Sequence, residues 1–223
     1  MTRKTIRPKR ARISSSQFRL IVSYFIDDLT AYTTSNLVKV NRHTVEDYFT
    51  RFRKIIYKKS CNLKKFNGEI EIDESYFGPT RIRGKRGRGA GGKIPVIGLL
   101  KRKSKVYTKV ITDCTRQQLL PVIKGKVLTG STIYTDGWNS YNGLILYGYK
   151  HKRIHHGENE FARGRNHVNG IESFWSYVKR RLRKFNGVPK DKFLLYLKES
   201  EWRFNHRKSM KKSFQKLLRK YIL

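Results

Sequence analysis

The clearest alternation of apolar and polar residues lies at residues 69–77, where isoleucines alternate with acids. A Gly-Pro pair follows immediately, so the pattern predicts a strand that ends sharply. Successive side chains of a strand point to opposite faces. One face is expected to carry Glu69, Glu71, Asp73 and Ser75, and the other Ile70, Ile72, Glu74 and Tyr76. Crowded carboxylates are typical either of a Mg²⁺ or Mn²⁺ site or of a sheet edge protected by charge, and the strand alone does not separate these alternatives.

Residues 1–12 form a basic arm without periodic hydrophobicity, and helical periodicity dominates the residues from there to about 60. Apolar residues recur at helical spacing after the serines at 14–16, which offer an N-cap, and again from about Thr44 onward. A short helix at 34–39 and a turn at 40–42 lie between these two segments. This pattern is typical of a helix-turn-helix DNA-binding module, and an ordinary three-helix packing module is the alternative. The third helix is expected to expose Arg42, His43, Arg51 and Arg53.

Strands and helices alternate after the acidic strand. Residues 79–93 are rich in Gly and Arg and have no apolar period, so they are predicted to form a loop that follows a nucleic-acid backbone. A Gly after an Asn and a following Pro end the most strongly amphipathic segment, a helix at 167–185. The other expected elements are strands at 94–101, 105–112, 131–136 and 149–154, and helices at 115–123, 139–146 and 191–205.

The charge balance favours a polyanionic partner. Lys and Arg number 51 against 16 Asp and Glu, which gives a formal net charge of +35. Such an excess destabilises a compact chain by self-repulsion unless a polyanion neutralises it, and nucleic acid is the default candidate. No apolar run approaches the length of a membrane span, no signal peptide is visible, and the 2 cysteines are isolated. We therefore expect an intracellular protein associated with DNA, in the cytoplasm or nucleoid if the source is bacterial, with no membrane partner.

Three acids from separate predicted elements form the candidate catalytic group. Asp73 and Asp136 lie at the ends of predicted strands, and Glu172 lies on the helix at 167–185. A mixed sheet flanked by helices can bring two strand ends and one helix face together, as in the ribonuclease H-like arrangement. Such carboxylates suit a pair of divalent metal ions that activate a water or a 3′-hydroxyl and stabilise the leaving oxygen of a phosphodiester.

Five short segments also form an ordered set of motifs. They are EIDESYFG, then GKIPVIGLLKR after the Gly- and Arg-rich loop, then IYTDGWNSY, HVNGIESFWSYVKRRL and EWRFNHR. This set resembles the DDE transposases of bacterial insertion sequences, and more narrowly their ISXO-like branch, in which a basic residue follows the third acid by two turns. The resemblance covers roughly residues 62–207. It implies a ribonuclease H-like catalytic domain, Mg²⁺ or Mn²⁺ as two bound ions, Asp73, Asp136 and Glu172 as catalytic metal ligands, and Lys179 on DNA.

The resemblance implies a transposase that cleaves the ends of an insertion sequence and joins the freed 3′-hydroxyls to target DNA. The alternatives are a structure-selective nuclease on the same fold and a catalytically retired transposase that acts as a DNA-binding regulator. We expect a basic arm and helix-turn-helix domain at 1–60, a catalytic domain at 61–207 and a basic tail at 208–223. Cutting two ends in one assembly calls for a homodimer or larger oligomer on double-stranded DNA. Relatives often carry an N-terminal zinc ribbon, for which this chain has too few cysteines.

Further residues are candidates for contact with DNA or for support of the three acids. Glu71 is either a supporting residue or an exposed acid, Asn169 either orients the site or begins the helix, and His167 is a third supporting candidate. Zinc binding by His155, His156 and His167 is disfavoured because no cysteine accompanies them. The DNA-binding candidates are Lys179, Arg183, Arg42, His43, Arg81, Arg83, Lys85, Arg86 and Arg88.

Overall fold

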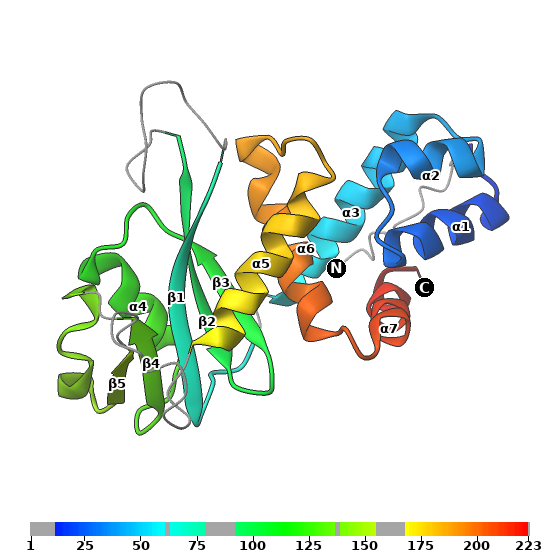
Figure 1. Ribbon diagram of the computed structural model, residues 1–223. Coiled ribbons are helices and arrows are strands. Elements are labelled where there is room, and N and C mark those ends of the chain that lie inside the picture. The colour runs from blue at the N-terminus through cyan, green and yellow to red at the C-terminus, as the bar shows by residue number, and fades with distance from the viewer. Residues whose placement is uncertain (1–11, 61–62, 79–91, 137–138, 155–167, 223) are drawn as a thin grey trace. The chain divides into compact units, whose positions relative to one another are not determined.

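The computed structural model describes residues 12–60, 63–78, 92–136, 139–154 and 168–222. The chain forms two compact units (Figure 1). One, here called the helical unit, combines Met1–Asn62 with Lys184–Leu223, and the other, the sheet unit, is Leu63–Arg183. None of the described helices combines the length and the apolar character that crossing a membrane requires.

A five-stranded mixed sheet is the centre of the sheet unit, in the order β3-β2-β1-β4-β5 (Figure 1). Strand β2 runs antiparallel to both of its neighbours, β1 and β3, whereas β4 is parallel to β1 and β5 is parallel to β4. This order and these directions form the predicted ribonuclease H-like sheet. The strands are β1 (Glu69–Phe77), β2 (Ile94–Lys101), β3 (Val106–Val110), β4 (Thr132–Asp136) and β5 (Lys150–Ile154).

The two faces of β1 have the different characters that its alternation predicts. Ile70 and Ile72 pack in a buried apolar cluster with Leu119 and Ile123 of α4 (Arg116–Lys126). The opposite face is turned toward α5 (Asn169–Arg183), because Glu71 binds a backbone amide of that helix. The acidic face of the central strand is therefore the face that α5 covers.

The connection between β4 and β5 differs from the prediction. Two short 3₁₀ helices, η1 (Asn139–Tyr141) and η2 (Leu144–Tyr147), replace the single helix predicted at 139–146. Gly143 separates them with φ 89°, a left-handed conformation that an α-helix does not tolerate and that glycine adopts without strain. This glycine breaks the helical periodicity.

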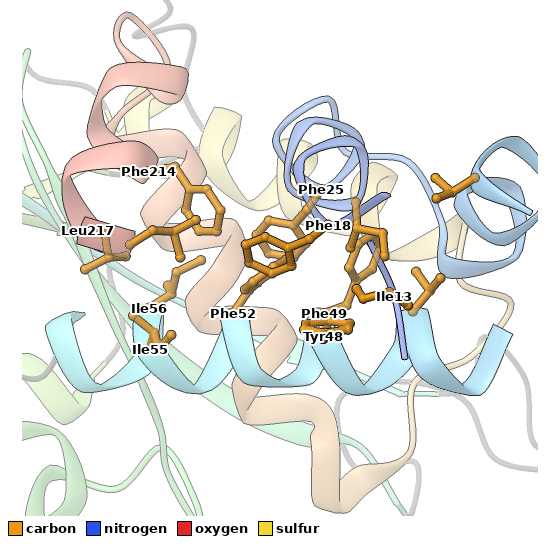
Figure 2. Packing of buried hydrophobic residues seen from close by; sticks show 14 of the residues in the cluster. Ile13, Phe18, Phe25, Tyr48, Phe49, Phe52, Ile55, Ile56, Phe214 and Leu217 are labelled. Atoms are coloured by element: carbon orange, nitrogen blue, oxygen red, sulfur yellow. The ribbon is translucent and has the colours of Figure 1, made fainter. Parts of the chain in front are cut away.

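Helices from both ends of the chain share one aromatic core in the helical unit. Figure 2 shows side chains of α1, α3 and α7 pointing toward one another. The Phe25 ring centroid lies 5.0 Å from that of Phe49 and 5.1 Å from that of Phe214, and Trp202 lies 5.7 Å from Phe214. The helices are α1 (Ser15–Ile26), α2 (Ala31–Val38), α3 (Arg42–Ser60), α6 (Lys190–Asn205) and α7 (Met210–Ile222).

Polar side chains determine where the first three helices begin. The Ser14 hydroxyl accepts a hydrogen bond from the backbone amide of Gln17, which forms the expected N-cap of α1. Helix α2 begins three residues earlier than predicted because Thr30 provides its N-cap. Helix α3 begins before the predicted Thr44, at a point where the Asn41 side chain accepts a hydrogen bond from the His43 amide.

The prediction that Arg53 is exposed on the third helix is wrong. Arg53 is buried, and its Nε donates to Glu199 Oε2 on α6 at 2.8 Å. Its guanidinium carbon also lies 3.8 Å from the centroid of the Tyr196 ring. A basic residue can occupy the core here because α6 supplies both a counter-charge and an aromatic surface.

The residues after 183 have a structural role in the helical unit. Helix α7 lies in the predicted basic tail at 208–223, and its Phe214 and Leu217 belong to the aromatic core. The expected catalytic range, 61–207, also extends beyond the compact sheet unit by the segment 184–207, which contains α6.

Candidate active site

Three acids that are distant in the sequence come near one another in the sheet unit. Asp73 lies on β1, Asp136 is the last residue of the neighbouring strand β4, and Glu172 lies in the first turn of α5. The negative charges of Asp136 and Glu172 each raise the pKa of Asp73, so both carboxylates lie within electrostatic range of it. The fold therefore gathers these three predicted acids around one strand.

The Asp73 carboxyl is partly buried and lies near two other acids. Burial, together with repulsion from the other two acids, raises its pKa from 3.8 to about 6. A hydrogen bond of 2.8 Å from the Glu74 amide to Asp73 Oδ1 acts in the opposite direction. The buried indole N–H of Trp175 also lowers the pKa of Asp73, because it favours the ionised carboxylate. Within the described chain this N–H has no hydrogen bond of ordinary geometry.

The chemistry of this donor set fits a divalent metal ion. Carboxylate oxygens are hard ligands of the kind that Mg²⁺ and Mn²⁺ prefer, and two or three negative charges in one place need a cation to neutralise them. In the part of the chain that the structure describes, no group of three or more His, Cys, Asp or Glu side chains is drawn together closely enough to hold a metal ion. Repulsion keeps carboxylates apart, and a divalent cation would draw them together.

Two glycines allow α5 to lie directly on the sheet beside Asp73. Gly98 pairs with Asp73 in the β1–β2 register, and a Cβ at Gly98 would lie 2.5 Å from the ring of Trp175. A Cβ at Gly170 would lie 2.7 Å from Glu71 Oε2. A lone glycine inside a strand is a sequence signal of close approach by another element, and Gly98 could have been recognised by it.

A second group that the sequence analysis missed lies on the other face of β1. The Tyr141 hydroxyl donates a hydrogen bond to the Glu74 carboxylate. Burial and the nearby charges of Glu74, Asp73 and Asp136 raise the pKa of Tyr141 well above its usual value. Tyr141 therefore stays a neutral hydrogen-bond donor next to the acids.

The predicted DNA-binding residues of α5 and α3 are exposed, unlike the buried Arg53, and they are Lys179, Arg183, Arg42 and His43. Lys179 lies two turns after Glu172 on α5, with its Nζ 6.0 Å from the centroid of the Phe77 ring, and Arg183 ends the helix. In the first turn of α3, Arg42 Nε contacts Glu46 at 2.7 Å and His43 Nδ1 contacts the same carboxylate at 3.7 Å.

The candidates for support of the site differ in outcome. Asn169 is exposed and is the first residue of α5, which agrees with its interpretation as a helix start. Glu71 is buried, so the alternative that it is merely exposed is wrong. The remaining candidates lie outside the described residues, and they are Arg81, Arg83, Lys85, Arg86, Arg88, His155, His156 and His167.

The sheet unit has a ribonuclease H-like sheet, with acids on β1, on β4 and on the covering helix. The general class of the protein is therefore the ribonuclease H-like fold. The chain belongs to the ISXO2-like transposase domain family, whose match extends over residues 65–205, more than half of the chain. This membership confirms the resemblance found in the five motifs. The family match also continues past the sheet unit into α6.

Relatives with similar sequences are described only in general terms. The chain is 49% identical over 104 residues to an uncharacterized transposase-like protein of Haemophilus influenzae. The matched region covers 47% of this chain and 84% of that protein. It is 33% identical over 155 residues to an uncharacterized protein in the transposable element ISH50 of Halobacterium salinarum, covering 61% of this chain and 52% of that protein. The chain thus spans about half the length of the second relative.

A similar solved structure is a simian T-cell lymphotropic virus intasome in complex with PP2A regulatory subunit B56 gamma. The TM-score is 0.40 and the sequence identity 11%, with 84% of this chain and 68% of that chain covered.

Proposed function

We propose that this protein is a DNA transposase that cleaves the ends of an insertion sequence and joins the freed 3′-hydroxyls to target DNA. The observation that carries the proposal is the gathering of Asp73, Asp136 and Glu172 in a member of the ISXO2-like transposase domain family. Water first hydrolyses the phosphodiester at the element end and leaves a 3′-hydroxyl. That hydroxyl then attacks a phosphodiester of the target, so one bond forms as another breaks.

Each acid has a proposed role in holding two divalent ions. Asp73 and Asp136 would share one Mg²⁺ or Mn²⁺ ion, and Glu172 would hold the second. When bound, such ions supply Lewis-acid stabilisation of the charge that develops on the phosphodiester oxygens. The raised pKa of Asp73 means that its proton must leave before the carboxylate can serve as a ligand, so protons compete with the metal below about pH 6.

Exposed basic residues support DNA as the substrate. Lys179 and Arg183 are exposed on the helix that carries Glu172, and Arg42 and His43 are exposed in the first turn of α3. The formal net charge of +35 supplies the long-range attraction to a polyanion. We propose that the helical unit contacts the element ends through α3 and that Lys179 contacts the DNA near the reacting phosphate.

The test is a strand-transfer assay with the full-length protein, using duplex DNA from both flanks of the gene, a plasmid target and Mg²⁺. Asp73→Asn, Asp136→Asn and Glu172→Gln should each lower cleavage and joining by at least about 10³-fold, which corresponds to about 4 kcal/mol of transition-state stabilisation. DNA binding should change little, because affinity comes from the basic surface.

Asp113→Asn is the matched control, since Asp113 is an exposed acid of the same unit that binds Thr115. A loss of less than about tenfold in all three site variants would contradict the assignment of the active site. Cutting without joining by the wild-type protein would favour the nuclease, and binding without cutting would favour the regulator. Sedimentation on DNA should show a homodimer or larger assembly.

A further inference from the structure

Glu71 is a buried acid with both carboxylate oxygens engaged. Its side chain is 2% exposed, and Oε1 accepts a hydrogen bond of 2.9 Å from Arg102 Nε. Oε2 accepts a hydrogen bond of 2.9 Å from the backbone amide of Ile171, in the first turn of α5. One side chain therefore joins the strand of Asp73 to the start of the helix that carries Glu172.

Arg102 extends this connection to β4. Its guanidinium carbon lies 3.7 Å from the centroid of the Tyr134 ring, and Tyr134 pairs with Glu71 in the β1–β4 register. The Tyr134 hydroxyl donates a 2.7 Å hydrogen bond to Glu69 Oε1, which lies 3.6 Å from Arg102 Nη1. Glu71, Arg102 and Tyr134 are called the anchor cluster below.

Each of the three acids lies one or two residues after a group of the anchor cluster or a group that the cluster binds. Glu71 lies two residues before Asp73, and Tyr134 lies two residues before Asp136. Residues two apart on a strand share a face, so both anchors lie on the same face as the acid that follows them. The backbone amide that Glu71 binds belongs to Ile171, the residue directly before Glu172.

The space around Glu71 leaves no room for adjustment at the start of α5. A Cβ at Gly170 would lie 2.7 Å from Glu71 Oε2 and 2.5 Å from Leu100 Cδ2. A side chain at position 170 must therefore displace both the Leu100 side chain and the Glu71 carboxylate, or else the helix. Repulsion among the three acids also pushes α5 away from β1, and a carboxylate at the helix N-terminus opposes this by a charge-assisted hydrogen bond.

We propose that Glu71 is a positioning residue that holds Glu172 close to Asp73, and that Arg102 and Tyr134 extend the same constraint to Asp136. The proposal rests on the proposed function for the role of the three acids. Glu71 does not touch the reacting atoms. It acts through the Ile171 amide, which determines where the first turn of α5 lies on the sheet.

The sharpest test is a pair of glycine substitutions in helices. Gly170→Ala should displace the Glu71 carboxylate, whereas Gly125→Ala in α4 is a matched control because no atom lies within 4 Å of a Cβ there. Alanine favours helix formation at both positions, so helix propensity alone predicts no harm from either substitution. A second pair compares Glu71→Gln with Asp113→Asn, an exposed acid of the same unit that contacts Thr115 and not the anchor cluster.

Two readouts separate positioning from general stability. The first is the affinity for Mn²⁺ alone, measured by calorimetry, and the second is hydrogen exchange of the peptide over residues 169–175. Gly170→Ala should weaken Mn²⁺ binding and speed this exchange by at least about tenfold, because α5 loses its anchor while all three acids remain. Glu71→Gln should be intermediate, since its amide oxygen can still accept the Ile171 N–H. Both controls should match the wild type.

Unchanged Mn²⁺ affinity and unchanged exchange in folded Gly170→Ala and Glu71→Gln would overturn the proposal and leave Glu71 a buried ion pair. Circular dichroism verifies folding, and either variant suffices if the other does not fold. Failure of the proposed function has a different signature. The wild-type protein would then neither cut nor join DNA, while the variants would still show the expected effects on Mn²⁺ affinity and hydrogen exchange. In that case Glu71 keeps its positioning role without transposition.

Discussion

Two acids, Glu199 of the helical unit and Asp73 of the sheet unit, have opposite surroundings. In the helical unit, the Glu199 carboxylate receives Arg53 and Arg203, each at 2.8 Å. In the sheet unit, the charges that act on Asp73 come from Asp136 and Glu172, and its pKa rises to about 6. An acid between two cations holds helices together, whereas an acid that faces other acids has an electrostatic cost that a cation relieves. Such perturbed groups cluster at functional sites.

The same contrast occurs within a single strand. Glu71 binds Arg102 and the α5 amide, while Asp73, two residues later on the same face, is repelled by its acidic neighbours. Glu71, which has a counter-charge, thus precedes Asp73, whose charged neighbours are acids. This order is expected if the first determines the position of the elements that carry the others.

The largest expected effect concerns the helical unit as a whole. A fragment of residues 1–62 should show no cooperative thermal unfolding by circular dichroism, because it lacks Trp202, Phe214 and Leu217 of the core. Loss of one large core side chain costs about 3–5 kcal/mol, against a total stability of about 5–15 kcal/mol. Joining residues 1–62 to 184–223 through a flexible linker should restore the transition. A stably folded fragment without the second segment would break the comparison between the units.

The next effect tests whether the paired acid is structural. Glu199→Gln should lower the free energy of unfolding by about 3–5 kcal/mol, since it removes the carboxylate between the buried charges of Arg53 and Arg203 and leaves only the more distant Asp28, at 3.4 Å from Arg203. Glu46→Gln removes the exposed partner of Arg42 and should cost no more than about 0.5 kcal/mol. Urea unfolding of both variants measures the difference, and equal values would contradict the structural role of Glu199.

Asp73→Asn should raise the free energy of unfolding of the metal-free protein, in contrast to Glu199→Gln, which should lower it. Folding raises the pKa of Asp73 from 3.8 to about 6, so the folded state binds the proton more tightly and the free energy of unfolding falls as pH rises through this window. At pH 7.5 with chelator, the variant should be more stable than wild type by about 1–3 kcal/mol, and at pH 3.5 the two should be equal. Urea unfolding at both pH values checks this.

Two controls sharpen the pH experiment. Added Mn²⁺ should stabilise the wild type more than Asp73→Asn, because only the wild type has the ionised carboxylate. Asp113→Asn should not stabilise the protein at pH 7.5, because hydrogen bonds from Thr115 lower the pKa of Asp113 and favour its ionised form. A stabilising effect of both substitutions would point to net charge rather than to the acid cluster.

The smallest expected effect concerns one exposed cation. Lys179→Gln should make the log–log dependence of DNA affinity on salt shallower by about 1, the contribution of one phosphate contact. Lys105→Gln, in the turn between β2 and β3, is the control and should leave the slope unchanged. Fluorescence anisotropy over a salt series measures both slopes. An unchanged slope for Lys179→Gln would remove this residue from the DNA surface.

Local patterns in the sequence determined much of the sheet unit. The alternation at residues 69–77 predicted both the limits of β1 and its two faces. The helical period before and after Glu172 predicted α5 to within two residues at each end. These features could be found because strand alternation and helix amphipathicity are recorded in neighbouring residues. The ordered motifs then gave the family and the three acids as candidates.

Only the tertiary structure decided which charged groups are neutralised and which are not. Arg53 is buried because Glu199 neutralises its charge. Glu199 lies 146 residues further along the chain, so no local pattern contains the pair. Glu71 and Asp73 have the same position in the alternation, yet one meets Arg102 and a helix N-terminus while the other meets two acids. The free energy of a buried charge depends on what surrounds it in three dimensions, and those neighbours come from other elements.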